Sequence, residues 1–309
     1  MSQFTTGAQL TPPAVSLELA WEGQWGYRLN LSSATTITVV QVAAHSVAGL
    51  VANGAVIPSA GQFAAVFDIS SQHAMDNTAA DTGAIVNASL STTFAVYWCT
   101  AGAFAGGLGF STTMPTRVSG VYLLGNGGNA AGCFFLGWIR VDGSGNVNNT
   151  TANRGIINYY NRQSLSLLAT PAYVNDNAET TFAMGASLTW AQINGGTGDS
   201  VQYIANGEDA IDLGMQAVLG AAAPAGGPYE FGIGDNSTTS ADSSACLLGA
   251  AAKYSSVSSL LTIVPSAGYR TANMLCMNKN NGLTFIADRA RNGATVDPKG
   301  TFLVGSVRG

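Results

Sequence analysis

The chain has 309 residues, of which 47% are hydrophobic and 9% are charged, and its formal net charge is −5 at pH 7. Globular domains average roughly 25% charged residues, so this surface must be built mainly from Ser, Thr, Asn, Gln, Gly and Ala. The high hydrophobic content excludes the composition of disordered chains, which combine low hydrophobicity with high net charge. An acidic chain with only three lysines also lacks the basic stripe that nucleic-acid binding requires.

The N-terminal segment has none of the features of a targeting sequence. It reads MSQFTTGAQLTPP, without a basic n-region or an apolar h-region, so we expect no signal peptide and synthesis in the cytoplasm. Residues 1–14 show no periodicity and contain Pro12-Pro13, which predicts an extended N-terminal arm. No apolar run approaches the roughly 18 residues of a membrane span, so we expect no membrane insertion.

From Val15 onward the sequence reads as one short strand after another. Residues alternate between apolar and polar with a period of two, and nowhere does a helical period of 3.6 hold for more than about two turns. Strands in succession without helices between them predict antiparallel sheets rather than parallel β–α–β units. We therefore predict an all-β fold, an antiparallel β-sandwich of jelly-roll type, with one module over 15–165 and a second over 166–309. The predicted strands include 15–21, 35–43, 91–99, 133–141, 187–193, 201–205, 211–219, 229–233, 260–264, 274–277, 283–286 and 302–307.

Two further expectations concern small residues and cysteines. The segment from Ala101 to Pro115 is rich in glycine and is predicted to be a loop. The four cysteines sit singly, mostly inside apolar runs, and are predicted to be buried free thiols. They are Cys99, Cys133, Cys246 and Cys276.

The stretch from Cys133 to Arg162 is the most informative part of the chain. It begins with nine mostly large and apolar residues, which predict a buried strand. The turn from Asp142 to Asn146 offers oxygen ligands at alternate positions, as calcium loops do, but the bidentate glutamate that completes such loops is missing. A plain turn is therefore the favoured interpretation.

Catalytic patterns are weak throughout. His45 and His73 show no ligand spacing, there is no G-x-S-x-G elbow, and the glycine-rich segments lack the lysine of a P-loop. The sequence thus predicts no cofactor and no metal. A carboxylate pair such as Glu208 and Asp212 would suit a polysaccharide depolymerase, although solvated acids at the start of a strand are the simpler reading.

Aromatic residues leave a second possibility open. Their faces stack on sugar rings, and Asn, Asp and Arg supply hydrogen bonds, although most aromatics of a sandwich lie in its core. The candidates for a subunit or glycan contact are Trp25, Tyr27, Tyr159, Tyr160 and Arg162.

Several motifs, taken in order, resemble those of a group of phage virion proteins of the tail-fibre, head-fibre or surface structural type. The resemblance covers about residues 116–309. The matching segments are Leu136-Gly137-Trp138-Ile139-Arg140, Asn158-Tyr159-Tyr160-Asn161-Arg162, Asn206-Gly207-Glu208-Asp209, Gly232 to Thr239 and the closing segment from Gly300 to Gly309. The chain departs from the group's pattern by an insertion between Arg117 and Leu136.

The resemblance implies a non-enzymatic component of the virion surface, commonly a homotrimer, which decorates the head or forms part of a fibre or spike. Its partners would be copies of itself and other capsid or tail proteins. An adhesin tip that binds a host glycan is the main alternative, and a polysaccharide depolymerase is the third. No catalytic residue carries over from the group.

Overall fold

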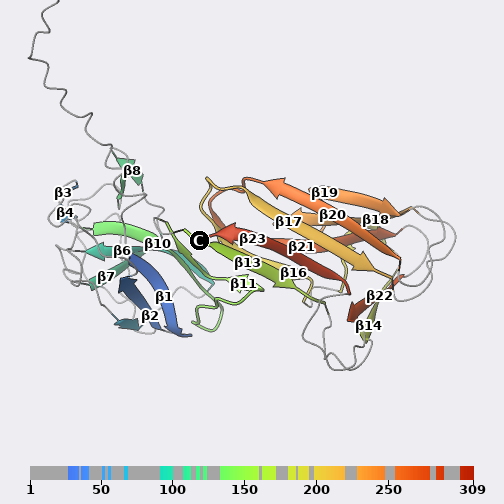
Figure 1. Ribbon diagram of the computed structural model, residues 1–309, viewed down its shortest axis with the longest axis horizontal. Helices are drawn as coiled ribbons and strands as arrows, with labels where there is room; N and C mark the ends of the chain where they lie inside the picture. Colours follow the sequence, from blue (N-terminus) through green and yellow to red (C-terminus); the bar gives the residue numbers. More distant parts are fainter. Residues whose placement is uncertain are drawn as a thin grey trace, which may run out of the picture. The chain divides into compact units, whose positions relative to one another are not determined.

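The computed structural model describes a little over half of the chain (Figure 1). The predicted N-terminal arm, the predicted strand over 15–21, Trp25 and Tyr160 lie outside the described residues. The described residues are 27–34, 36–41, 51–52, 55–56, 66–68, 91–99, 107–112, 116–118, 121–123, 133–159, 162–171, 180–185, 187–194, 198–219, 228–247, 255–278, 283–288 and 300–309.

Within these residues the secondary structure is strand throughout, with turns between strands and no helix. The prediction of an all-β fold with antiparallel sheets packed as a sandwich is therefore confirmed; the jelly-roll topology and the arm stay predictions. Accordingly, no helix in the described ranges is long and apolar enough to cross a membrane. The strands are β1 (Tyr27–Ser33), β2 (Thr36–Gln41), β3 (Val51–Ala52), β4 (Ala55–Val56), β5 (Val66–Asp68), β6 (Thr92–Cys99), β7 (Gly107–Ser111), β8 (Thr116–Val118), β9 (Val121–Leu123), β10 (Cys133–Val141), β11 (Asn153–Arg154), β12 (Ile156–Asn158), β13 (Ser164–Ala169), β14 (Thr180–Met184), β15 (Ser187–Gln192), β16 (Ser200–Ala205), β17 (Ile211–Val218), β18 (Tyr229–Asp235), β19 (Ser243–Leu247), β20 (Ser256–Ile263), β21 (Gly268–Asn278), β22 (Leu283–Asp288) and β23 (Phe302–Arg308).

The chain divides into two compact units, the first formed by residues 1–146 with 158–161 and the second by residues 147–157 with 162–309. The boundary suggested by the sequence, between residues 165 and 166, falls inside β13. In the first unit, β10 pairs with β6 and β6 with β7, while β1, β2 and β5 form a separate three-stranded sheet. Its core contains the T-shaped pair Phe135 and Trp138, both essentially buried.

The second unit is the sandwich proper, and its strands run side by side in two layers (Figure 1). One layer has the order β13-β23-β17-β20. The other has the order β11-β16-β21-β18-β19, and β15 pairs with the end of β21 that extends beyond the first residue of β16. All neighbours in these layers are antiparallel except β11 and β16, which run parallel.

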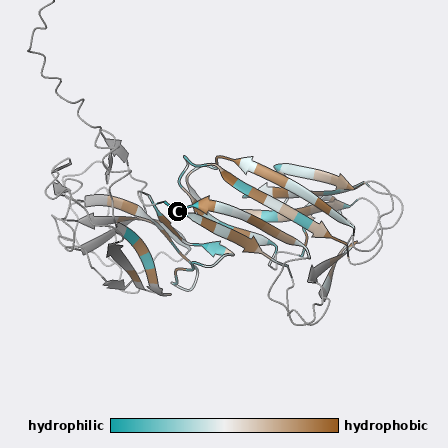
Figure 2. Ribbon diagram, in the orientation of Figure 1, coloured by the Kyte–Doolittle hydropathy of each residue, from teal (hydrophilic) through white to brown (hydrophobic). Residues whose placement is uncertain are grey.

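Alternation of side chains along β17 shows how the sequence forms this sandwich. Ile211, Leu213 and Met215 are buried against the other layer, whereas Asp212 between them is exposed. Successive side chains of a strand point to opposite faces, so a period of two gives one face to the core and one to solvent. Figure 2 shows the same alternation of apolar and polar colours along the long strands of this unit.

Three sequence-based expectations are wrong. The glycine-rich segment from Ala101 to Pro115 contains a strand, β7, because all five of its residues from Gly107 to Ser111 pair with β6. The strand β19 was missed. Cys246 is exposed rather than buried, because it falls on the outward-facing position of β19, while Cys276 is buried as predicted.

Candidate functional site

The first two described residues of the Asn158–Arg162 motif hold the first unit together. The Asn158 side chain is buried, and its Oδ1 accepts a hydrogen bond from the backbone nitrogen of Leu29 at 2.6 Å. Its Nδ2 donates to the carbonyl of the same residue at 3.4 Å. The amide thus replaces a strand partner for β1. A buried backbone group without such a partner would cost free energy, so Asn158 has a structural reason to be there.

Tyr159 lies in the aromatic core of the first unit. Its ring is 3% exposed and packs at 5.9 Å from Trp138 in a T-shaped arrangement and at 5.6 Å from Phe135. Edge-to-face contacts of this kind stabilise aromatic cores. With both faces of the ring covered, a sugar has no access to Tyr159 in this unit.

Arg162 belongs to the second unit and forms a forked ion pair with two adjacent carboxylates. Its Nη1 lies 2.9 Å from Oδ2 of Asp209, and its Nη2 lies 2.7 Å from Oε2 of Glu208. The guanidinium is planar with fixed donors, so two carboxylates at this spacing fix its orientation. Arg308 lies 3.8 Å from the other oxygen of Asp209, but its side chain is 63% exposed. We call Arg162, Asn206, Glu208, Asp209 and Arg308 the Arg162 cluster.

The loop that carries these carboxylates is itself held by hydrogen bonds. Oδ1 of Asn206 accepts from the backbone nitrogens of Glu208 and Asp209, at 2.8 and 3.0 Å, and its Nδ2 donates to Asp209. Gly207 has a φ of +83°, and a Cβ placed there would approach Ala267 to 3.1 Å. The Asn-Gly-Glu-Asp sequence is therefore a tight turn in which asparagine closes the loop and glycine permits the left-handed backbone.

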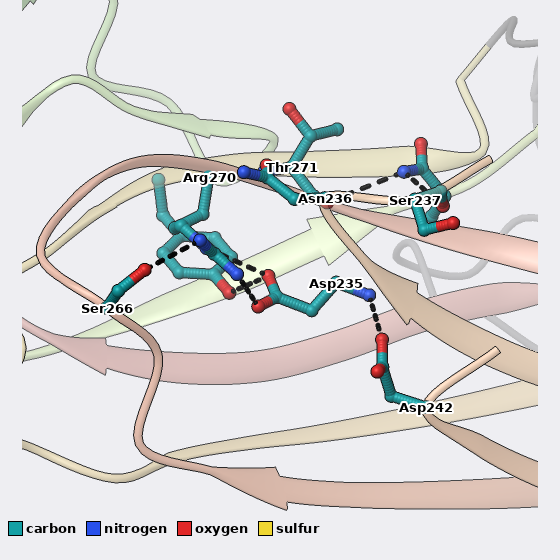
Figure 3. Close-up of polar contacts among 9 residues, drawn as sticks. Asp235, Asn236, Ser237, Asp242, Ser266, Arg270 and Thr271 are labelled. Carbon is teal, nitrogen blue, oxygen red and sulfur yellow. Dashed lines mark hydrogen bonds and ion pairs between the residues drawn. The ribbon is translucent and has the colours of Figure 1, made fainter. Parts of the chain in front are cut away.

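A second cluster lies at the same end of the sandwich, where β16 and β18 end and β21 begins. Arg270 forms an ion pair with Asp235 through Nη2 and Oδ2, and Tyr203 donates its hydroxyl hydrogen to Oδ1 of Asp235 at 2.9 Å. Nη1 of Arg270 donates to Oγ of Ser266 at 2.9 Å. Figure 3 shows the Arg270 and Asp235 side chains pointing toward one another, with Ser266 on the far side of the guanidinium. We call Tyr203, Asp235, Asp242, Ser266 and Arg270 the Asp235 cluster.

Burial distinguishes this second cluster. The Asp235 side chain is 5% exposed, and Tyr203 is fully buried. Burial, together with the charge of Asp235 and the hydrogen bond to it, raises the pKa of Tyr203 well above its usual value. The hydrogen bond to Asp235 likewise raises the pKa of Arg270. Both effects keep the phenol neutral and the guanidinium charged, which suits a fixed ion pair and not proton transfer.

The loop after Asp235 folds back over β18, and this explains the Gly-Ile-Gly-Asp sequence. A Cβ at Gly232 would lie 2.2 Å from the carbonyl oxygen of Ser243, and one at Gly234 would lie 2.5 Å from that of Ser240. No side chain fits at either position. Asn236, with a φ of 57°, exchanges hydrogen bonds with Thr271, and Oδ2 of Asp242 accepts from the backbone nitrogen of Asp235 (Figure 3).

The structure gives the remaining carboxylate candidates ordinary partners. Oδ1 of Asp142 accepts from the backbone nitrogens of Ser144 and Asn146, as in a plain turn. Oδ1 of Asp212 accepts from the hydroxyl of Thr262 at 2.7 Å, while Glu208 is paired with Arg162. In the part of the chain that the structure describes, no group of three or more His, Cys, Asp or Glu side chains could hold a metal ion.

The structure brings together residues that the sequence analysis treated as separate candidates. Arg162 and the Glu208-Asp209 pair were singled out separately, and their contact across 46 residues was not foreseen. The Asp235 cluster was missed, because Tyr203 lies in a mostly apolar strand, β16, and Arg270 lies in the polar first half of β21. Tyr203 and Arg270 are direct partners across the two strands, and only the strand register shows this. Tyr27 begins β1, and Trp25 and Tyr160 lie outside the described residues.

Comparison with known proteins gives only remote similarity. No protein-family model matches the chain, and the search of curated proteins gives no significant match. Among solved structures, the chain is similar to dimeric latent PorU from Porphyromonas gingivalis, at 9% identity and a TM-score of 0.29, covering 70% of this chain and 21% of that one. It is also similar to the infectious bursal disease virus Gx strain structure, at 11% identity and a TM-score of 0.23, covering 70% and 57%. The chain therefore spans about a fifth and just over half of these two structures.

Proposed function

We propose that this chain is a non-enzymatic structural protein of a bacteriophage particle, exposed on the virion surface as a fibre, spike or capsid-decorating component. The observation that carries the proposal is the structural role of the motif residues by which this chain resembles phage virion proteins. The Asn158 side chain hydrogen-bonds to the backbone of β1, and Tyr159 packs in the aromatic core of the first unit. Arg162 forms ion pairs with the loop at Asn206–Asp209. Residues that serve as a scaffold in this way suit a protein whose task is to hold its shape.

Charge and composition support the same reading. The carboxylates of the Arg162 and Asp235 clusters are occupied by arginine, tyrosine or backbone donors. With 9% charged residues, the surface is mostly neutral and small, which favours close contact with neighbouring subunits in a large assembly. A homotrimer, which the resemblance implies, is part of this proposal.

Immunogold electron microscopy of purified particles with antibodies against the recombinant chain tests the proposal. We expect labelling at regular positions on the particle surface, together with chain copies in the particle in a fixed ratio to the major capsid protein. Presence of the chain in infected lysate but absence from purified particles would contradict the proposal.

A glycan array and a reducing-sugar release assay on host polysaccharide separate the two alternatives. A structural protein gives no release and no glycan binding. Binding without release would favour an adhesin tip. Release that is lost in Glu208→Gln but kept in Arg308→Ala, with both variants folded, would favour a depolymerase.

A further inference from the structure

The two edge strands of the β13-β23-β17-β20 layer differ in whether the backbone N–H and C=O groups on their outer side are hydrogen-bonded. At the β13 edge, Arg154 donates from Nε and Nη2 to the carbonyl of Ser166, at 3.0 and 2.8 Å. The backbone nitrogen of Leu168 donates to the carbonyl of Thr151 at 2.9 Å. A side chain and a neighbouring segment thus occupy the groups that a further strand would need.

In the described residues, no side chain or neighbouring segment is bonded to the outer backbone of β20 in this way; β19 of the other layer lies close to its inward face, where Oγ of Ser243 is 2.9 Å from Oγ of Ser259. Among the described strands, β20 pairs only with β17, along all eight of its residues. Its sequence, SVSSLLTI, contains no charged residue and no proline. Natural proteins protect exposed edges with lysine, proline, bulges or covering segments, because a free row of N–H and C=O groups is a template for pairing with another chain.

The outward face beside this edge is apolar at its centre. Leu260 is 78% exposed, the highest value among the large hydrophobic residues described, and Val304 is 41% exposed. Both pair with Gly214, which lies between them on β17. A Cβ on Gly214 would lie 3.3 Å from Leu260 and 3.8 Å from Val304, so the glycine lets the two side chains approach over the middle strand. Leu168 continues the same row on β13.

We propose that β20 is a homotypic docking edge, at which a second copy of this chain adds its own β20 in antiparallel orientation. Leu260 lies opposite Leu260 of the second copy, and Ser258 lies opposite Thr262 of that copy. This register keeps every outward side chain on the outward face, since directly opposite residues of an antiparallel pair share a face. It extends the layer from four strands to eight and covers the most exposed leucine.

Charges allow this two-fold pairing. The strand itself is neutral, and among the described residues the nearest outward charge is Asp212, which lies one strand inward beside Thr262. Three strand spacings and a four-residue offset separate the two Asp212 carboxylates by about 20 Å, which exceeds a Debye length of about 8 Å at physiological salt. Within the described ranges no like charges meet at the edge, so the second copy is a compatible partner.

A second copy fits better than a head-to-tail arrangement. In a head-to-tail chain the open β20 edge would have to meet the β13 edge of the next copy, whose Ser166 carbonyl and Leu168 nitrogen are already bonded. Pairing of like edges avoids this and closes after two copies, because a two-fold contact uses the same patch on both. The proposal does not rest on the virion role: a chain that is absent from phage particles would still pair through β20.

Light scattering after size exclusion, over a micromolar concentration series of the full chain, tests the contact. We expect the mass to rise with concentration to an even multiple of the 31.5 kDa chain, starting from one chain, or from three chains where the proposed trimer forms through another surface. Leu260→Lys places a charge at the centre of the contact and should shift the midpoint at least tenfold to higher concentration. Leu188→Lys is the matched control, since Leu188 is 71% exposed but lies on β15 in the other layer. A wild-type mass that stays at one chain or at three chains throughout, or equal masses for wild type and Leu260→Lys, overturns the proposal.

Cross-linking tests the register. In a Cys246→Ser background, which removes the thiol that is exposed among the described cysteines, Leu260→Cys should give a disulfide-linked dimer under mild oxidation because opposite residues lie within disulfide range. Ser256→Cys, exposed on the same strand but opposite Val264 of the second copy, should not. Equal cross-linking at both positions, or none at position 260, contradicts the register; the comparison does not depend on folding changes, because both positions are exposed.

Discussion

The second unit contains two arginine–carboxylate clusters at one end of its sandwich, and they differ mainly in burial. In the Asp235 cluster the carboxylate is 5% exposed and shared between Arg270 and a buried tyrosine. In the Arg162 cluster the carboxylates of Glu208 and Asp209 are 33% and 18% exposed. Water stabilises a half-exposed charge that loses its partner, but not a buried one. Loss of the arginine partner should therefore destabilise the fold much more in the Asp235 cluster than in the Arg162 cluster.

The largest expected effect follows from breaking the buried pair. Arg270→Met removes the cation from the buried carboxylate of Asp235 and leaves it the hydroxyl of Tyr203, which should lower the free energy of unfolding by about 3 to 5 kcal/mol. Guanidinium unfolding at pH 7 measures this loss. Ser266→Ala is the control, because it removes only the exposed hydrogen bond to the same guanidinium and should cost less than about 0.5 kcal/mol. Equal losses in the two variants would show that Arg270 contributes through its length and not its charge.

The next effect concerns the loop that covers Asp235. Gly234→Ala places a methyl group 2.5 Å from the carbonyl oxygen of Ser240 and 2.6 Å from that of Ser237, so the loop must move. We expect a loss of about 1 to 3 kcal/mol in thermal or chemical unfolding. Gly185→Ala is the matched control, since nothing lies within 4 Å of its Cβ position. A Gly234→Ala variant as stable as Gly185→Ala would mean that the loop does not hold this position in solution.

A smaller effect is expected in the half-exposed cluster. Arg162→Met removes both ion pairs to Glu208 and Asp209 and should cost about 1 to 2 kcal/mol, less at high salt because exposed pairs are screened. Arg308→Ala, whose nitrogen lies 3.8 Å from Asp209 on an exposed side chain, should be nearly neutral. Unfolding at low and high ionic strength measures both variants. A loss for Arg162→Met that equals the Arg270→Met loss would remove the distinction between the clusters.

Particular strands show what the sequence could and could not predict. The bounds of β10 were predicted in full, because its nine residues are large and apolar except for Gly137 and Arg140 and are bounded by turn residues. Only the second half of β21 was predicted. Its first half contains Arg270 and Thr271, polar residues that face the Asp235 cluster and the covering loop instead of a core. The edge strand β19 was missed because its five residues alternate between partly buried and exposed, with none fully buried, and its sequence SSACL has no strong hydrophobic pattern.

The site shows the same limit. Each half of the Arg162 cluster was visible as a polar motif, but their contact depends on the antiparallel pairing of β13, β23 and β17, which brings residues 162, 308 and 209 to one end of the layer. The Asn-Gly sequence at residues 206 and 207 is typical of a turn and forms one in the structure. Charge pairing across 46 residues had no local signal, because it follows from strand register.

The last prediction separates the two clusters by pH. Tyr203 is buried against Asp235, so its folded pKa is raised above the usual value of about 10. An acid with a raised folded pKa contributes stability that is fully present below the unfolded pKa and falls as pH rises above it, since the unfolded chain loses the proton first. Stability should therefore fall by about 1.4 kcal/mol per pH unit from this group above pH 10. Tyr203→Phe should lose about 1 kcal/mol at pH 7, where it forgoes one hydrogen bond, yet show a shallower decline at alkaline pH. The Arg162 cluster contains no tyrosine, so Arg162→Met should keep the wild-type slope. Parallel alkaline slopes for wild type and Tyr203→Phe, measured by unfolding between pH 9 and pH 11, would mean that the phenol is already ionised or solvated in the folded protein.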